Sequence, residues 1–169
     1  MRIGSSDGNG LGGMIKALIS DFSRVLLFPV DPQYTGGLNA LHQQLSESGD
    51  YGFWEHFQLN RALLEFYRSL GERVGVYMFT SEHIQEHQAL QPELEGVFRK
   101  VLSGALIGLK KTDAESYTSI ARTIGLHPSE VLYVDDNEAN CGAARRAGMA
   151  ATHYESNEQT MSAIKQQLH

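Results

Sequence analysis

The stretch VLYVDDNEAN, residues 131–140, decides the fold of this chain, because an apolar run of strand length ends in two adjacent carboxylates and leads into a helical pattern. A similar run, KALIS at residues 16–20, ends at Asp21. Short apolar runs of this kind are typical of buried strands. In a parallel sheet, ligands bind beyond the carboxyl ends of the strands, so the two runs predict a site formed by Asp21, Asp135 and Asp136.

Strands and helices alternate along the rest of the sequence. We expect strands at residues 15–20, 73–79, 101–103 and 131–134 and near Ala150, and an apolar hairpin or flap at residues 24–30. Helical patterns cover residues 38–45, 53–70, 82–90, 113–124 and 138–147, and a last helix ends at Gln167. This alternation predicts an α/β fold in which helices cover both faces of a parallel sheet.

The length and composition fit one domain. The chain has 169 residues, of which 41% are hydrophobic, and a chain of this size buries about 70% of its unfolded surface. Its net charge of −6 argues against a nucleic-acid or anionic-membrane partner, which would favour clustered Lys and Arg. The single cysteine cannot form an internal disulfide, and no apolar stretch reaches the roughly 18 residues that span a membrane. We therefore expect a cytoplasmic protein.

Residues 1–13 differ in composition from the rest of the chain. They contain five glycines and almost no apolar periodicity, which is typical of a flexible leader or an expression remnant. Gly8, Gly10 and Gly13 match a dinucleotide-binding spacing, but that motif must follow a strand, whereas these glycines precede one. We therefore place the folded α/β domain at residues 14–169.

The three aspartates also predict a bound cation. Carboxylates that converge from separate strands repel one another unless they share a positive charge. Mg²⁺ is the expected ion, because it prefers oxygen ligands and keeps water molecules that a phosphate can replace. The alternative is that each aspartate only caps the helix after it, since aspartate is common at that position. The convergence of the whole set favours the metal.

Four motifs stand in a fixed order: Asp21-Phe-Ser23, Thr80-Ser81, Lys111 to Tyr117, and Asp135 to Asn140. This order resembles that of the haloacid dehalogenase-like (HAD) hydrolase superfamily, and the resemblance extends from Met14 to about Tyr154. It implies a doubly wound, Rossmann-like α/β fold. The interval between the first two motifs is short, so a small cap or insert can occupy only about residues 33–60.

The resemblance also implies roles for the acidic residues. Asp21 would be the nucleophile and would form an aspartyl-phosphate that water then hydrolyses. Mg²⁺ would be held by the Asp21 carboxylate, the backbone carbonyl of Ser23 and Asp136, with Asp135 as a further ligand or as a partner of the ligands. Asn140 would hold the shape of the loop.

The remaining motifs would bind the phosphate of a small phosphate ester. The hydroxyls of Thr80 and Ser81 would hydrogen-bond the oxygens of the transferred group, and Lys111 would neutralise their charge. Lys110 is an alternative to Lys111, although Lys111 fits the spacing to Tyr117 better.

Ser23 departs from the commonest pattern of the family, which has a second aspartate there, and Arg24 stands where glycine is common. The second aspartate protonates the leaving oxygen and later activates water, and such general acid–base catalysis contributes about 10²–10⁴-fold. We therefore expect a phosphatase that favours good leaving groups. The alternatives are a weak or inactive domain that binds or regulates a partner, and a dehalogenase, which the Asp135–Asp136 pair disfavours. The sequence leaves open whether the chain forms a homo-oligomer.

Two other features have two interpretations each. The aromatic cluster at residues 51–57 is either part of the core or a wall for substrate, and we favour the core. His83 and His87 have the spacing of a zinc pair on a helix, but Glu82 and Glu86 beside them indicate a solvated helix face.

Overall fold

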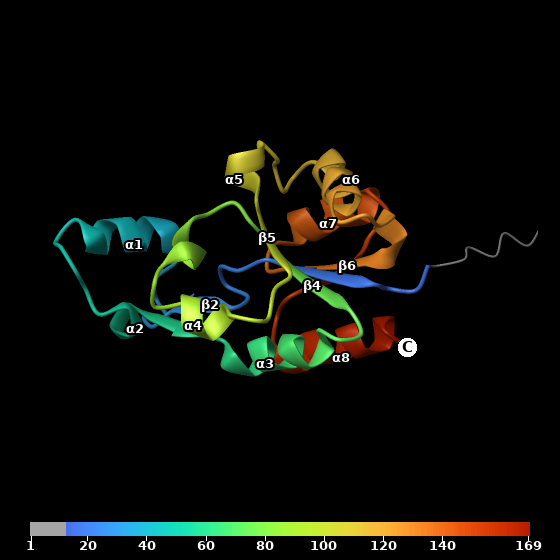
Figure 1. Cartoon of the computed structure of the whole chain (residues 1–169). Coiled ribbons are helices and arrows are strands. Elements are labelled where there is room, and N and C mark those ends of the chain that lie inside the picture. Colours follow the sequence, from blue (N-terminus) through green and yellow to red (C-terminus); the bar gives the residue numbers. More distant parts are fainter. Residues whose placement is uncertain (1–12) are drawn as a thin grey trace, which may run out of the picture.

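The computed structural model describes residues 13–169, so the predicted leader lies outside the described residues except for Gly13 (Figure 1). Its centre is a five-stranded sheet with the strand order β5-β4-β1-β6-β7. The strands, all parallel to their neighbours, are β1 (Ala17–Ser20), β4 (Gly75–Thr80), β5 (Lys100–Ser103), β6 (Val131–Asp135) and β7 (Ala150–His153). Each overlaps a strand expected from the sequence, and the predicted α/β, Rossmann-like fold is confirmed.

Helices pack on both faces of the sheet (Figure 1). One face carries α3 (Arg61–Leu70) and α8 (Asn157–Gln167), and the other carries α6 (Ala114–Thr123) and α7 (Glu138–Arg146). Along β1, Leu18 packs in the core on the α3 and α8 side, whereas Ala17 and Ile19 pack on the α6 and α7 side. Because successive side chains of a strand point to opposite faces, two apolar cores form.

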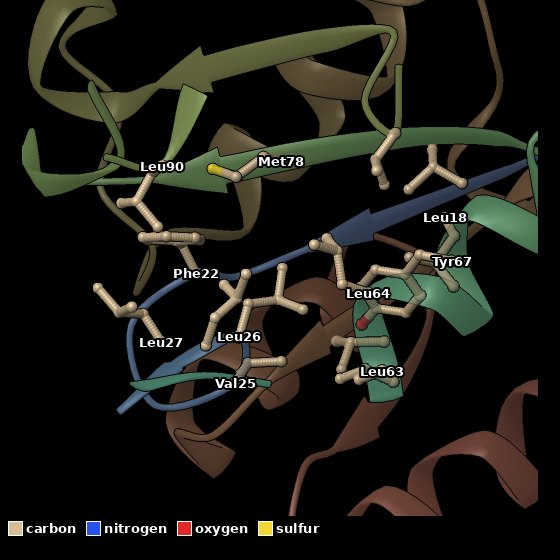
Figure 2. Close-up of a cluster of buried hydrophobic side chains, with 14 of the residues drawn as sticks. Leu18, Phe22, Val25, Leu26, Leu27, Leu63, Leu64, Tyr67, Met78 and Leu90 are labelled. Atoms are coloured by element: carbon tan, nitrogen blue, oxygen red, sulfur yellow. The ribbon is translucent and has the colours of Figure 1, made fainter. Parts of the chain in front are cut away.

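The spacing of apolar residues explains α3. Its buried side chains are Leu63, Leu64, Tyr67 and Leu70, which fall on one face of a helix. The helix begins after Asn60, whose side chain accepts a hydrogen bond from the N–H of Leu63 at 3.3 Å. Figure 2 shows Leu63, Leu64 and Tyr67 directed into the core that also holds Leu18 of β1. α3 is therefore fixed to the strand that leads to Asp21.

A small insert follows β1. Strand β2 (Leu27–Pro29) pairs antiparallel with β3 (Phe57–Leu59), and the chain between them forms α1 (Leu38–Ser46) and α2 (Phe53–His56). α1 matches the helix expected at residues 38–45, but the prediction of one helix over residues 53–70 is wrong.

The strand β3 breaks that predicted helix. Phe57 and Leu59 are buried while Gln58 between them is exposed, which is the alternation of a strand. Pairing with β2 uses the backbone hydrogen-bonding groups of this segment, and Asn60 then starts a new helix. Phe53 and Phe57 are 5% and 1% exposed, so these two aromatic side chains belong to the core.

The helix expected at residues 82–90 is also wrong. A single 3-10 turn forms at Ile84–Glu86, and α4 (Gln91–Leu94) follows. Ile84 and Leu90 are both buried, although six residues of helix would place them on different faces. The histidine pair on a helix face is therefore lost, and the ring of His87 instead stacks on Phe53, with centroids 4.4 Å apart.

The remaining elements are short. They are α5 (Gly104–Ile107) and a 3-10 turn at Pro128–Glu130, neither of which the sequence pattern predicted. Within residues 13–169, every helix is too short or too polar to cross a lipid bilayer.

Candidate active site

The candidate site lies at the carboxyl ends of three adjacent strands. Asp21 follows β1, Thr80 ends β4, and Asp135 ends β6 with Asp136 directly after it. Because β1 lies between β4 and β6 and all three are parallel, their ends meet at one edge of the sheet. There they line a cavity of about 210 Å³, together with Lys111.

Three carboxylates converge in this cavity. Each of Asp21, Asp135 and Asp136 offers an oxygen, and these oxygens lie within 4.8 Å of one another. Burial raises the pKa of Asp21 to about 8, an effect that Lys111 opposes and Asp135 reinforces. Burial and the charge of Asp135 also raise the pKa of Asp136. The set consists of three oxygen-donor side chains whose negative charge one lysine compensates only in part, and it fits a hard divalent cation such as Mg²⁺.

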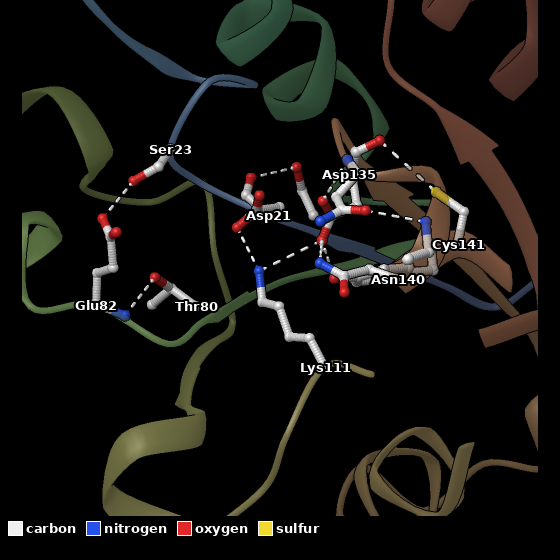
Figure 3. Close-up of polar contacts among 12 residues, drawn as sticks. Asp21, Ser23, Thr80, Glu82, Lys111, Asp135, Asn140 and Cys141 are labelled. Carbon is white, nitrogen blue, oxygen red and sulfur yellow. Dashed lines mark hydrogen bonds and ion pairs between the residues drawn. The ribbon is translucent and has the colours of Figure 1, made fainter. Parts of the chain in front are cut away.

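Lys111 supplies the positive charge of the cavity. Its Nζ lies 2.5 Å from Asp21 Oδ1 and 3.4 Å from Asp135 Oδ2, and its side chain is 10% exposed (Figure 3). The backbone carbonyl of Lys111 accepts a hydrogen bond from the hydroxyl of Tyr117 at 2.6 Å, which holds the loop before α6. Of the two adjacent lysines, Lys111 faces the aspartates and Lys110 is exposed.

Asp135 is held by several donors. Its Oδ2 accepts hydrogen bonds from Tyr133 Oη at 2.5 Å and from Asn140 Nδ2 at 3.1 Å, and its Oδ1 accepts one from the N–H of Asn137 at 2.9 Å. A carboxylate has about four lone-pair sites, so with Lys111 included few remain on Asp135. The geometry therefore favours Asp136 as the freer of the two carboxylates.

Two residues of this network were missed from the sequence. Tyr133 lies two positions before Asp135, on the same side of β6, and this period-two spacing was the available signal. His153 of β7 lies with its Nε2 2.8 Å from the backbone carbonyl of Asp136. No sequence signal marked His153, because its contact with Asp136 arises only when β7 pairs with β6 in the sheet.

The turn after Asp21 has an unusual backbone. Arg24 has φ of 60°, in the left-handed region that costs a residue with a side chain about 1–2 kcal/mol. Its guanidinium donates hydrogen bonds to the carbonyls of Tyr34 at 3.1 Å and Gly36 at 2.7 Å, which offsets part of that cost. Arg24 thereby ties the turn that carries Ser23 to the start of the insert.

Ser23 itself is paired with an acid. Its hydroxyl donates a hydrogen bond to Glu82 Oε2 at 2.7 Å (Figure 3). Glu82 lies two residues after Thr80 and lines the same cavity as Asp21. The sequence pattern assigned Glu82 to a solvated helix face, and this assignment is wrong because no helix forms there.

Thr80 and Ser81 complete the cavity. Thr80 is 1% exposed, and its Oγ1 accepts a hydrogen bond from the N–H of Glu82 at 3.1 Å. Among residues 13–169 its hydroxyl donates no hydrogen bond, so it can donate one to a ligand. Ser81 is exposed and also lines the cavity. The predicted residues Asp21, Ser23, Thr80, Ser81, Lys111, Asp135, Asp136 and Asn140 thus all line one cavity.

Known phosphatases are similar to this chain in sequence. A sesquiterpene phosphatase of Aspergillus oryzae is 31% identical over 98 residues, which cover 57% of this chain and 50% of that protein. An enolase-phosphatase of Parvibaculum lavamentivorans is 29% identical over 163 residues, which cover 86% of this chain and 64% of that protein. The chain thus spans between about half and two thirds of these two relatives.

Solved structures share the fold. A HAD-superfamily hydrolase of Geobacter sulfurreducens superposes with a TM-score of 0.68 and 18% identity, covering 94% of this chain and 98% of that one. A HAD family enzyme of Bacteroides thetaiotaomicron, solved in complex with magnesium and inorganic phosphate, has a TM-score of 0.63 at 16% identity, over 85% and 96% of the two chains.

A protein-family comparison completes this picture. The description "haloacid dehalogenase-like hydrolase" matches residues 38–148, which are more than half of the chain and include the ends of β4 and β6. The match agrees with the parallel sheet and with the convergence of its strand ends. The chain therefore belongs to the haloacid dehalogenase-like hydrolase family.

Proposed function

We propose that this protein is a phosphatase that hydrolyses small phosphate monoesters through an aspartyl-phosphate on Asp21. One observation carries the proposal: the Asp21 carboxylate lies at the end of the central strand, in a cavity, with Lys111 Nζ at 2.5 Å. A carboxylate can attack phosphorus when nearby cations offset the repulsion between the two anions. The similarity to proteins named as phosphatases supports the same chemistry.

Mg²⁺ is part of the proposal. The carboxylates of Asp21 and Asp136 and the backbone carbonyl of Ser23 would hold the ion, with Asp135 as a further ligand or, as its many donors favour, as a group that orients the others. When bound, Mg²⁺ would neutralise charge on the nucleophile and on the phosphate.

The protein's own donors would bind the phosphate. The Thr80 hydroxyl accepts the N–H of Glu82, and it would donate its own proton in a hydrogen bond to a phosphate oxygen. Ser81 would add a second hydroxyl from the same turn. The ammonium group of Lys111, which contacts Asp21, would shift towards the phosphate oxygens as Asp21 forms its bond to phosphorus.

The insert would act as a small cap. It contributes Gly37 and Leu38 to the lining of the cavity, whereas the buried aromatic side chains Phe53 and Phe57 pack in the core. We therefore place the proposed cap at about residues 33–60. We expect it to cover one side of the site and to leave the rest open to a substrate.

The preference for good leaving groups, expected because serine is a weak acid, requires that no other acid reaches the leaving oxygen. Glu82 lies within hydrogen-bond distance of Ser23, so the preference depends on what Glu82 does. Dehalogenase chemistry is not proposed, since the Asp135–Asp136 pair is retained.

A panel of phosphate esters tests the proposed function. Hydrolysis by the wild-type protein should require Mg²⁺, and Asp21→Asn should remove it, because an amide cannot serve as the nucleophile. Equal rates for wild type and Asp21→Asn would contradict the proposal.

Ser23 favours a second candidate function, a domain that has lost catalysis and binds a partner. Ser23→Asp separates the two candidates if the wild-type protein is inactive. Mg²⁺-dependent hydrolysis by the variant would show that the site lacked only an acid, and continued inactivity would favour the binding function.

A further inference from the structure

The cavity also contains an acid, Glu82, that the proposed reaction does not yet use. Glu82 lies beside Ser23, with its Oε2 2.7 Å from the serine hydroxyl (Figure 3). Among residues 13–169, Glu82 forms no ion pair with a lysine or an arginine. A glutamate in a phosphate-binding cavity would repel the substrate when it is ionised, and it can serve as an acid when it carries a proton. Its presence there calls for a chemical reason.

Hydrogen bonds of its backbone and side chain position Glu82. Its N–H donates to Thr80 Oγ1 at 3.1 Å, and its backbone carbonyl accepts from Gln85 Nε2 at 2.7 Å. On the side of the insert, a Cβ added to Gly37 would lie 3.7 Å from Glu82 Oε1. Two hydrogen bonds thus fix the backbone of Glu82, and the hydrogen bond from Ser23 holds its partly buried carboxylate.

We propose that Glu82, acting through the Ser23 hydroxyl, donates and accepts the proton in this reaction. The inference rests on the proposed phosphatase function. The hydroxyl of Ser23 would contact the leaving oxygen, and Glu82 would supply the acidity that serine lacks. The acid of this site would therefore come from the segment after β4 instead of the segment after β1.

The reaction would take place in two steps. In the first step, the bond between Asp21 and phosphorus forms and the bond from phosphorus to the leaving oxygen breaks. The Ser23 proton passes to the leaving oxygen, and the proton of Glu82 replaces it on Ser23, so the leaving group departs as an alcohol. In the second step, a bond forms between the water oxygen and phosphorus, and the bond between Asp21 and phosphorus breaks. One proton of the water passes through Ser23 to Glu82, and inorganic phosphate is released from Asp21.

Glu82→Gln tests the relay, because glutamine keeps a hydrogen-bond acceptor for Ser23 but cannot transfer the proton. For glycerol phosphate, whose leaving group is poor, kcat/KM should fall by about 10²–10⁴-fold. For p-nitrophenyl phosphate, whose leaving group needs no proton, kcat/KM should fall much less. The variant should also release an initial burst of p-nitrophenol, because attack by water on the aspartyl-phosphate becomes the slow step.

Two further variants separate the relay from a structural role. Glu86→Gln makes the same chemical change on an exposed residue outside the cavity and should leave both rates unchanged. Ser23→Asp, introduced into the Glu82→Gln protein, returns a carboxylate to the site and should restore hydrolysis of glycerol phosphate. A structural role for Glu82 predicts neither the rescue nor the burst.

The possible failures can be told apart. If hydrolysis depends on Asp21 but Glu82→Gln loses the same factor for both esters, shows no burst and is not rescued, the relay is wrong and the proposed function stands. If no hydrolysis depends on Asp21, the proposed function fails and the relay fails with it.

Discussion

Tyr133 and Tyr117 show how single side chains hold the charged residues of the cavity in place. Both tyrosines are fully buried, and their rings pack edge to face with centroids 4.9 Å apart. The hydroxyl of Tyr133 donates to the carboxylate of Asp135, whereas the hydroxyl of Tyr117 donates to the neutral carbonyl of Lys111. A hydrogen bond to a charged group contributes more to stability than a neutral one.

This difference gives a matched prediction. Tyr133→Phe should lower the free energy of unfolding by about 1.5–3 kcal/mol, and Tyr117→Phe by about 0.5–1.5 kcal/mol. Urea denaturation of the metal-free proteins measures both values. An equal loss, or a larger loss for Tyr117→Phe, would show that Tyr133 does not stabilise a charged Asp135.

Sequence motifs predicted the acidic residues of the site and two of their partners, Lys111 and Asn140, but not the contacts of Glu82 and His153. Asp21, Asp135 and Asp136 each follow an apolar run, which is a local signal. Glu82 and His153 act through contacts that bring separate segments together, namely Ser23 with Glu82 and the Asp136 carbonyl with His153. Such contacts depend on strand order, and one sequence does not encode strand order in any short window.

Among the secondary-structure elements, the segment from β3 into α3 joins the insert to the sheet. Asn60 stands between them, and its side chain makes contacts with three parts of the chain. It accepts from the N–H of Leu63, donates to the carbonyl of Val25 at 2.9 Å, and donates to Asn157 Oδ1 at 2.7 Å. It thus caps α3 and also links this helix to the turn after Asp21 and to the start of α8.

Asn60→Ala should therefore cost more than an ordinary helix cap. Loss of a cap alone costs about 1 kcal/mol. Ser156→Ala at the start of α8 serves as that reference, because among residues 13–169 the Ser156 side chain accepts a single hydrogen bond, from the N–H of Gln159. We expect Asn60→Ala to lower the free energy of unfolding by about 2–4 kcal/mol, since it also leaves buried partners unpaired. Equal losses for the two variants, measured by urea denaturation, would contradict the linking role.

The elements that were predicted correctly carry a clear local pattern. β1 and β6 are continuous apolar runs, whereas the buried residues of α6 and α7 recur with the period of a helix. The two wrong helices, at residues 53–70 and 82–90, contain apolar residues whose spacing fits more than one structure. Their conformation is decided by pairing of β3 with β2 and by burial of Ile84 and Leu90, which are tertiary effects.

The whole molecule brings three carboxylates together at one edge of a sheet that has an apolar core on each face, one of which is drawn in Figure 2. The oxygens of Asp21, Asp135 and Asp136 lie within 4.8 Å, with Lys111 as the basic side chain that contacts them among the described residues. In the metal-free fold, Lys111 therefore relieves only part of the repulsion among the three carboxylates. A ligand that binds only the folded state should relieve it and stabilise the whole protein.

Mg²⁺ should accordingly raise the stability of the folded protein. At a hundredfold excess over its dissociation constant, a ligand adds about 2.7 kcal/mol, which thermal unfolding would detect as a higher Tm. NaCl at matched ionic strength controls for screening, and Asp136→Asn should abolish most of the effect. An equal rise in Tm for wild type and Asp136→Asn would exclude this set as the magnesium site.

The central claim is that Asp21 carries the phosphoryl group. The most direct measurement is to mix the protein with Mg²⁺ and p-nitrophenyl phosphate, quench with acid, reduce with borohydride and analyse the peptides by mass spectrometry. An aspartyl-phosphate is reduced to homoserine, so we predict this change at position 21 and nowhere else in the chain. Hydrolysis with Asp21 unmodified, or with the change at another aspartate, would contradict the claim.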